Sequence, residues 1–169
     1  MIILETTRLI LKTIEKEDSQ VLHDLLFCDE ETMKYTFGAK AFTLEETKKF
    51  IYKNFCKNNA IVGLAPLFEK KSGLIIGIAG VLKNEQLGDS HYEFGFIIAP
   101  DYRQNGYATE IAQSEITFIK KRLKQQYVYA LAHPENDLSI KLIEKLGLNL
   151  QNTIEVKGRG ERVVYSKRV

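Results

Sequence analysis

Hydrophobic and polar positions along the chain follow two periods, and the period predicts which element each segment forms. Val21, Leu22, Leu25 and Leu26 recur at helical spacing and predict an amphipathic helix. Short apolar runs bounded by Gly, Asn or Lys predict strands. The expected order is a strand at 8–14, helices at 18–27, 30–35 and 43–57, strands at 61–69, 74–83 and 92–98, a helix at 105–123, a strand at 127–132, a helix at 136–147, and strands at 148–156 and 161–167.

Local motifs mark several of these boundaries. Thr43 and Glu46 have the Thr-x-x-Glu spacing of a helix start. In this motif each of the two side chains accepts a hydrogen bond from the backbone N–H of the other residue. The segment 70–73 ends in glycine and predicts a hairpin turn, and a terminal hairpin is expected across 158–160. Pro66 has no N–H to donate, so it predicts a sheet edge or a bulge.

The order of elements predicts a mixed α/β layer fold in one domain spanning 1–169. The strand at 92–98, the helix at 105–123 and the strand at 127–132 form a parallel crossover unit, which is right-handed by rule. Strands before and after this unit are joined as antiparallel hairpins. We therefore expect a mostly antiparallel, twisted sheet with one central parallel pair and helices on both faces.

Composition narrows the class of protein. The chain has 169 residues, 44% of them hydrophobic and 27% charged, and its net charge is +2. This balance gives no bulk electrostatic argument for nucleic acid or membrane partners. The two cysteines, Cys28 and Cys56, and the scattered histidines form neither a disulfide framework nor a metal pattern. With no secretory leader visible at the N-terminus, we expect a cytoplasmic protein that binds no metal.

The turn after the strand at 92–98 carries the most informative chemistry. Gly106 can adopt backbone angles closed to other residues, and Ala108 keeps the next turn position small. N–H groups at the start of the following helix then remain free to bind an anion, and Arg103 can add a charge-assisted hydrogen bond. A glycine that only packs the helix on the sheet is the alternative. Neither the nucleotide-triphosphate loop nor the three-glycine dinucleotide motif is present.

These residues resemble the GCN5-related N-acetyltransferases (GNAT). The pattern Arg103-x-x-Gly106-x-Ala108, preceded by a strand that ends in Ala-Pro-x-Tyr, is similar to the family's first motif. The run at 136–148 resembles its second, Asn-x-x-Ser followed by a helix and Leu-Gly. The segment 7–12 is similar to the first strand of the RimJ/RimL-type branch.

The resemblance implies that acetyl-CoA is the co-substrate and that it lies where the parallel strands splay apart. Its pantetheine arm would pair with the backbone of the strand at 92–98, and the turn would surround the pyrophosphate. The implied cofactor-binding residues are Ile97, Ile98, Ala99, Arg103, Gln104, Asn105, Gly106, Tyr107, Ala108 and Asn136. A backbone N–H near Ile97 would stabilise the oxyanion, and Asn136 can also simply cap its helix.

Two side chains are candidates for acid–base catalysis. Glu93 matches a glutamate common in the RimJ/RimL-type branch and is the candidate base or amine-binding group, although a solvated or salt-bridged residue fits the pattern as well. Ser139 matches a serine to which that branch assigns the leaving-group acid, with helix capping as the alternative. Many family members carry a tyrosine where this chain has Ile143, which cannot donate a proton.

The resemblance predicts an N-acetyltransferase that acts directly on a primary amine, either a protein N-terminus or a small molecule. A non-catalytic acyl-CoA-binding module is the alternative, and a homodimer is compatible with the sequence. His91 is a second candidate for proton removal. The aromatic residues Tyr35, Phe37, Phe42 and Phe50 fit either an acceptor pocket or the core.

Overall fold

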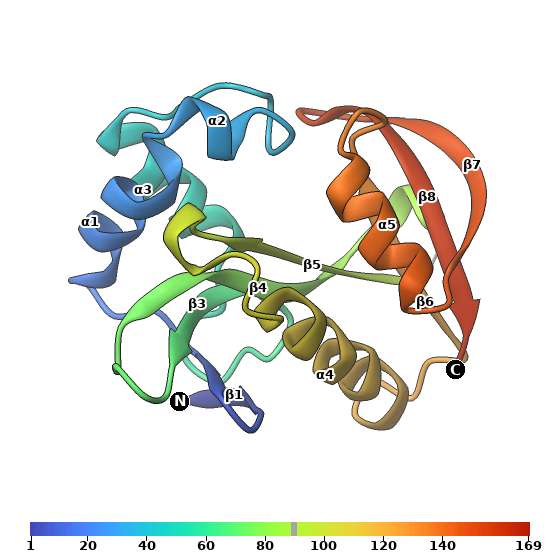
Figure 1. The fold of residues 1–169 in the computed structure, drawn as a ribbon, viewed down its shortest axis with the longest axis horizontal. Helices are drawn as coiled ribbons and strands as arrows, with labels where there is room; N and C mark the ends of the chain where they lie inside the picture. Colours follow the sequence, from blue (N-terminus) through green and yellow to red (C-terminus); the bar gives the residue numbers. More distant parts are fainter. Residues whose placement is uncertain (89–90) are drawn as a thin grey trace.

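The computed structural model describes residues 1–88 and 91–169, and its framework is one eight-stranded sheet. The strand order is β1-β2-β3-β4-β5-β6-β8-β7. Figure 1 shows β5 crossing the middle of the molecule, with the N-terminal helices on one side and α5, β7 and β8 on the other. The strands are β1 (Ile2–Glu5), β2 (Leu9–Lys12), β3 (Gly63–Glu69), β4 (Ile75–Lys83), β5 (Tyr92–Ile98), β6 (Tyr127–Ala132), β7 (Asn149–Val156) and β8 (Gly160–Arg168).

The helices mostly fall where the apolar spacing predicts them. The expected helix at 18–27 is continuous but changes from an α-helix to a π-helical segment at His23. The helices are α1 (Asp18–Leu22), η1 (His23–Phe27), α2 (Glu30–Met33), α3 (Leu44–Asn54), η2 (Glu85–Leu87), η3 (Pro100–Tyr102), α4 (Tyr107–Lys121) and α5 (Asp137–Lys145).

The predicted caps and hairpins are confirmed. The hydroxyl of Thr43 accepts from the N–H of Glu46, and the Glu46 carboxylate accepts from the N–H of Thr43. β3 and β4 are joined at 70–74 as an antiparallel pair, and β7 pairs with β8 across the predicted terminal turn.

Two sequence-based expectations differ from the structure. The edge strand β1 was not expected, because its four residues carry no alternating pattern; it pairs with β2 across a short turn. The edge interpretation of Pro66 is wrong, since β3 lies between β2 and β4. The bulge interpretation is supported, because the β3–β4 register shifts one residue later, between Leu67 and Phe68.

The sheet opens between its two central parallel strands. β5 pairs with β6 at Glu93 opposite Tyr129, and no paired position follows among the described residues. By contrast, β5 stays paired with β4 along its whole length, from Tyr92 opposite Lys83 to Ile98 opposite Gly77. The carboxyl end of β5 therefore keeps a free edge where it diverges from β6.

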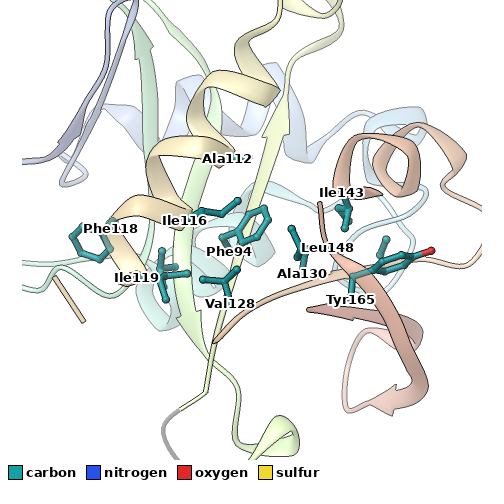
Figure 2. Close-up of a cluster of buried hydrophobic side chains, with 12 residues drawn as sticks. Phe94, Ala112, Ile116, Phe118, Ile119, Val128, Ala130, Ile143, Leu148 and Tyr165 are labelled. Atoms are coloured by element: carbon teal, nitrogen blue, oxygen red, sulfur yellow. The ribbon is translucent and has the colours of Figure 1, made fainter. Parts of the chain in front are cut away.

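Helices cover both faces of the sheet. In β4, Ile78 packs in a core with α1, η1 and α3, whereas the next residue, Ala79, packs with Ile111 of α4. A third core lies under α4 and α5 around Phe94. In Figure 2, Phe94, Val128 and Ala130 lie between the two helices, whereas Phe118 lies on the outer side of α4. These cores hold β5 rigidly against β4 and α4, and so fix the position of its free edge.

Candidate functional site

The free edge of β5 presents backbone groups to the opening. The N–H of Ala99 donates to the carbonyl of Ile76 over 2.9 Å, so Ala99 faces β4. Backbone groups of alternate residues point to opposite sides of a strand, so Ile97 also faces β4 while Phe96 and Ile98 face the opening. β4 and β5 lie so close together here that a Cβ atom added to Gly77 of β4 would lie 2.2 Å from the carbonyl oxygen of Ile97. The N–H groups of Phe96 and Ile98, not that of Ile97, are thus the available donors.

The turn that follows β5 opens α4 with a left-handed glycine. Gly106 has φ of 78° and precedes the first helical residue, Tyr107, with no side-chain cap. The first N–H groups of a helix have no intrahelical partner, so this end of α4 offers donors and a positive dipole end to an anion. Gln104, which is exposed, adds a second left-handed residue with φ of 62°. The turn that was predicted to bind a phosphate therefore contains two residues with left-handed backbone angles, Gln104 and Gly106.

The side chains of this turn are engaged mainly with the protein. Arg103 donates through Nε to the Ile98 carbonyl over 2.9 Å and through Nη2 to the Thr32 hydroxyl over 3.4 Å, which ties α2 to the end of β5. The Asn105 amide donates to the backbone carbonyls of Tyr102 and Arg103. The predicted contact between Arg103 and a pyrophosphate would require the guanidinium to leave these partners or to share its remaining donors.

Arg8 is a residue near the cradle that sequence reasoning missed. Its Nη1 donates to the Asn105 carbonyl over 2.8 Å, and its Nε forms an ion pair with Glu110 over 2.6 Å. Its guanidinium also lies over the ring of Tyr107, whose hydroxyl donates to Glu69. That hydrogen bond raises the pKa of Tyr107, so the phenol stays protonated. Arg8 is about a hundred residues away from these partners in sequence, so no local pattern could reveal its role.

A cavity continues from the free edge of β5 into the space between β5, β6 and α5. Its walls include Glu93, Ile97, Asn136 and Ser139, so the structure gathers both catalytic candidates and two of the cofactor-binding candidates at one cavity. The side chains of Ile98 and Ala99 instead belong to two different cores. Ala108 is half-buried and packs against the core that contains Ile98 and Ile111.

The helix α5 brings Asn136 and Ser139 to the cavity wall. The Asn136 side chain caps α5 by accepting from the N–H of Ser139 over 3.2 Å. The Asn136 side chain therefore caps α5, and the Ser139 hydroxyl takes no part in this capping hydrogen bond. Ile143, one turn further along, is 3% exposed and also lines the cavity. Ser139 supplies the hydroxyl of this wall, and Ile143 is apolar.

Glu93 is buried, with 4% of its surface exposed, and both of its carboxylate oxygens are bound. Oε1 accepts from Nη1 of Arg159 over 2.5 Å, and Oε2 accepts from the Asn84 amide over 2.6 Å. The salt-bridged alternative considered for Glu93 thus describes its contacts here. Each carboxylate oxygen has two lone pairs, so one on each oxygen remains for a further donor such as an amine.

Two arginines from the C-terminal hairpin complete the cavity and were not predicted. Arg159 comes from the β7–β8 turn, and Arg162 comes from β8, where it is 2% exposed. Arg162 donates to the backbone carbonyls of Glu161 and Tyr35 over 2.7 and 3.5 Å. Burial lowers the pKa of Arg162, although a guanidinium still remains charged at neutral pH.

The candidate aromatic and histidine residues divide between cavity and core. Tyr35 and Phe37 line the cavity, whereas Phe42 stacks on Phe27 and Phe50 packs tilted against it in the core under α1 and α3. Phe50 also lines a neighbouring groove beside α3. His133 lines the cavity and packs on Tyr35, whereas His91 stacks on Tyr129. Across 1–88 and 91–169, no cluster of three or more His, Cys, Asp or Glu side chains is arranged to hold a metal ion. No helix in these residues is long and apolar enough to cross a bilayer.

Comparisons with known proteins agree with this geometry. Residues 8–149 match the family model described as an acetyltransferase (GNAT) domain. The uncharacterized N-acetyltransferase YnaD of Bacillus subtilis is 29% identical over 143 residues, which cover 85% of this chain and 80% of that protein. The crystal structure of a GNAT-family acetyltransferase from Bacillus anthracis superposes with a TM-score of 0.81 at 25% identity, covering 99% of this chain and 98% of that one. RimL, a ribosomal alpha-N-protein acetyltransferase in complex with coenzyme A, has a TM-score of 0.77 at 14% identity, covering 100% of this chain and 98% of that one.

Proposed function

Since the chain belongs to the GNAT family of acetyltransferases, we propose that it transfers the acetyl group of acetyl-CoA directly to a primary amine. The observation that carries this proposal is the free edge of β5, which ends in the left-handed turn at Gly106. An edge with unpaired backbone groups suits an extended, amide-containing arm, and the N-terminus of α4 suits a pyrophosphate. The residues present therefore fit coenzyme A.

Each chemical requirement of the transfer has a candidate group in the cavity. Bound acetyl-CoA supplies an activated thioester. The N–H groups of Phe96 and Ile98 are positioned at the free edge to stabilise negative charge on its carbonyl oxygen. As the N–C bond forms and the C–S bond breaks, the amine loses the one proton that the thiolate gains.

Proton transfer is assigned to Glu93 and Ser139. A free lone pair on the Glu93 carboxylate would orient the amine and accept its proton. The Ser139 hydroxyl, which lines the same cavity, would donate to the leaving thiolate and regain a proton from solvent, to which Glu93 releases the proton taken from the amine. We place the protein with the RimJ/RimL-type enzymes on the strength of the segment 7–12, and RimL supports this at the level of the fold.

One observation favours a second candidate function, a non-catalytic acyl-CoA-binding module. Ile143 lines the cavity where many family members carry a tyrosine, so no phenol stands there to protonate the thiolate. A sensor of this kind would bind acetyl-CoA and leave it intact in the presence of any amine.

The test is a thiol-release assay with acetyl-CoA and a panel of amines, combined with mass spectrometry of the acetylated product. We expect Glu93→Gln to slow transfer by roughly 10²–10⁴-fold, the usual range for a positioned acid or base, with little change in coenzyme A affinity. Glu17→Gln, at an exposed position before α1, is the matched control and should keep wild-type turnover. Wild-type turnover in Glu93→Gln would show that Glu93 is structural. Coenzyme A binding without transfer to any amine would favour the sensor.

A further inference from the structure

Positive charge exceeds negative charge inside the cavity. Two guanidinium groups, those of Arg159 and Arg162, line the cavity with one carboxylate, that of Glu93, and a second carboxylate, that of Glu155, acts on Arg162 from outside the cavity. Arg162 is almost fully buried, and the bonds it forms within the described chain are to backbone carbonyls. The Nε of Arg159 is also buried and has no hydrogen-bond partner among the described residues. A buried guanidinium that is hydrogen-bonded to no carboxylate is costly, so this wall is suited to an anionic ligand.

Positive charge also exceeds negative charge in the groove just outside the cavity. Glu93, Arg159 and Phe37 line both the cavity and a wider groove that opens between α3, the β4–η2 segment and the β7–β8 turn. The acidic side chains of the groove are Glu85 and Glu93, against Arg159 and the lysines Lys49, Lys53, Lys83 and Lys157. The whole chain carries only +2. Charge is therefore concentrated at this mouth, where a concave surface focuses the field on an approaching ligand.

The groove lies on the acceptor side of the site. The cradle at Gly106 follows the carboxyl end of β5, whereas Glu93 lies near the start of that strand, next to the groove. At about 3.3 Å per residue, the strand between Glu93 and Ile98 separates the two by roughly 16 Å. An acceptor that enters through the groove meets Arg159 and Glu93 before it reaches the free edge of β5.

From these contacts, and resting on the proposed acetyltransferase function, we infer that the acceptor is a primary amine that carries one or more carboxylates and has a net negative charge. Its carboxylate takes one or both arginines as partners, because the planar guanidinium fork matches a carboxylate. Its amino group donates to a free lone pair of the Glu93 carboxylate. An acidic α-amino acid and the N-terminus of an acidic peptide share this chemistry. A polyamine, by contrast, would add positive charge to a site that already has an excess.

The experiment compares acceptors that differ in charge and little in shape. The arms are free glutamate and glutamine, an Asp-Glu-rich peptide and its Asn-Gln-rich counterpart, and spermidine. We expect kcat/KM for each acidic acceptor to exceed that of its amide partner by about 10- to 100-fold, the range for a hydrogen bond to a charged group. Comparing kcat/KM for glutamate with kcat/KM for the acidic peptide shows whether the acceptor is a free amino acid or the N-terminus of a peptide. Raising the ionic strength should lower kcat/KM for the acidic acceptors only.

Variants at the groove test the surface without disturbing buried groups. Lys83 and Lys157 are exposed, and the double variant Lys83→Gln/Lys157→Gln should raise KM several-fold for acidic acceptors with kcat unchanged. Lys141→Gln, exposed on α5 and outside the groove, is the matched control. Arg162→Gln should remove the preference for acidic acceptors, with thermal unfolding and coenzyme A affinity measured to establish that the variant is folded.

The outcomes separate this inference from the proposed function. Equal or faster transfer to the amide acceptors or to spermidine would overturn the inference and leave the acetyltransferase in place. An acidic preference that persists unchanged in the folded Arg162→Gln variant and in the lysine double variant would also overturn it. Transfer to no acceptor at all would count against both.

Discussion

At the residue scale, Glu115 is the side chain most at odds with its surroundings. It belongs to α4, is completely buried, and neither of its carboxylate oxygens has a hydrogen-bond partner among the described residues. Burial raises the pKa of Glu115 well above 4.5, and the nearby backbone of Gly80 offsets this only in part. The carboxyl is therefore protonated in the folded protein at a pH where it would be ionised in the unfolded chain.

This predicts a distinct dependence of stability on pH. As the pH rises above about 4.5, the unfolded chain releases the Glu115 proton first, so folding loses up to about 1.4 kcal/mol per pH unit until the folded carboxyl also ionises. Glu115→Gln removes this loss. Chemical unfolding between pH 5 and 8 should show the variant gaining stability relative to wild type as the pH rises.

The exposed Glu17→Gln serves as control here too and should follow the wild-type curve. Parallel curves for Glu115→Gln and wild type would contradict the account, because they would mean that Glu115 ionises equally easily in both states.

Glu93, Asn136, Ser139 and Gly106 could be named as candidates from the sequence, because each lies inside a local motif. Arg159 and Arg162 could not be named in this way. Both are separated from Glu93 by more than sixty residues, and only the pairing of β6 with β8 brings them to the cavity. The sequence placed the oxyanion donor near Ile97 but could not specify Phe96 and Ile98, since which backbone groups face the opening depends on hydrogen bonding to β4 rather than on residue type.

At the scale of elements, the start of α5 carries a residue with a structural role, Asn136, and a residue with a proposed chemical role, Ser139. The Asn136 side chain caps the helix, and Ser139 contributes its N–H to that cap while its hydroxyl stays at the cavity wall. We expect Asn136→Ala to lose about 1 kcal/mol of unfolding free energy through the lost cap. Ser139→Ala should leave stability nearly unchanged and lower kcat.

The measurement is thermal unfolding and turnover on the same three proteins, wild type and the two variants. Undiminished kcat in Ser139→Ala would remove Ser139 from the catalytic residues and leave water as the proton donor. A stability loss in Ser139→Ala equal to that in Asn136→Ala would instead show that the hydroxyl shares in the cap.

Most elements could be predicted because their signals are local. The capping box of α3, the glycine turns and the apolar spacing of α4 depend on neighbouring residues. The strand β1 was missed because it is a short edge strand stabilised by its pairing with β2. Pro66 was expected at an edge or a bulge because it has no N–H to donate, and only the three-dimensional pairing shows that β3 is an inner strand whose register with β4 shifts one residue after Pro66.

At the scale of the whole molecule, the cofactor and the acceptor are assigned to opposite ends of one opening. The cradle at Gly106 lies after the carboxyl end of β5, and the basic groove lies beside Glu93 near its start. The cores on the two faces of the sheet hold β5 between these ends. This arrangement requires coenzyme A to occupy the cradle and the free edge of β5.

The most direct test is calorimetric titration of coenzyme A into wild type, Gly106→Val and Gly73→Val. Gly73 also has positive φ, 71°, and lies in the β3–β4 turn with open space around it, so both variants should lose at least about 1–2 kcal/mol of stability. Affinity for coenzyme A should fall about 10- to 100-fold in Gly106→Val, because the new side chain obstructs the N–H groups of the cradle, and should be unchanged in Gly73→Val. Wild-type affinity in folded Gly106→Val would contradict the account.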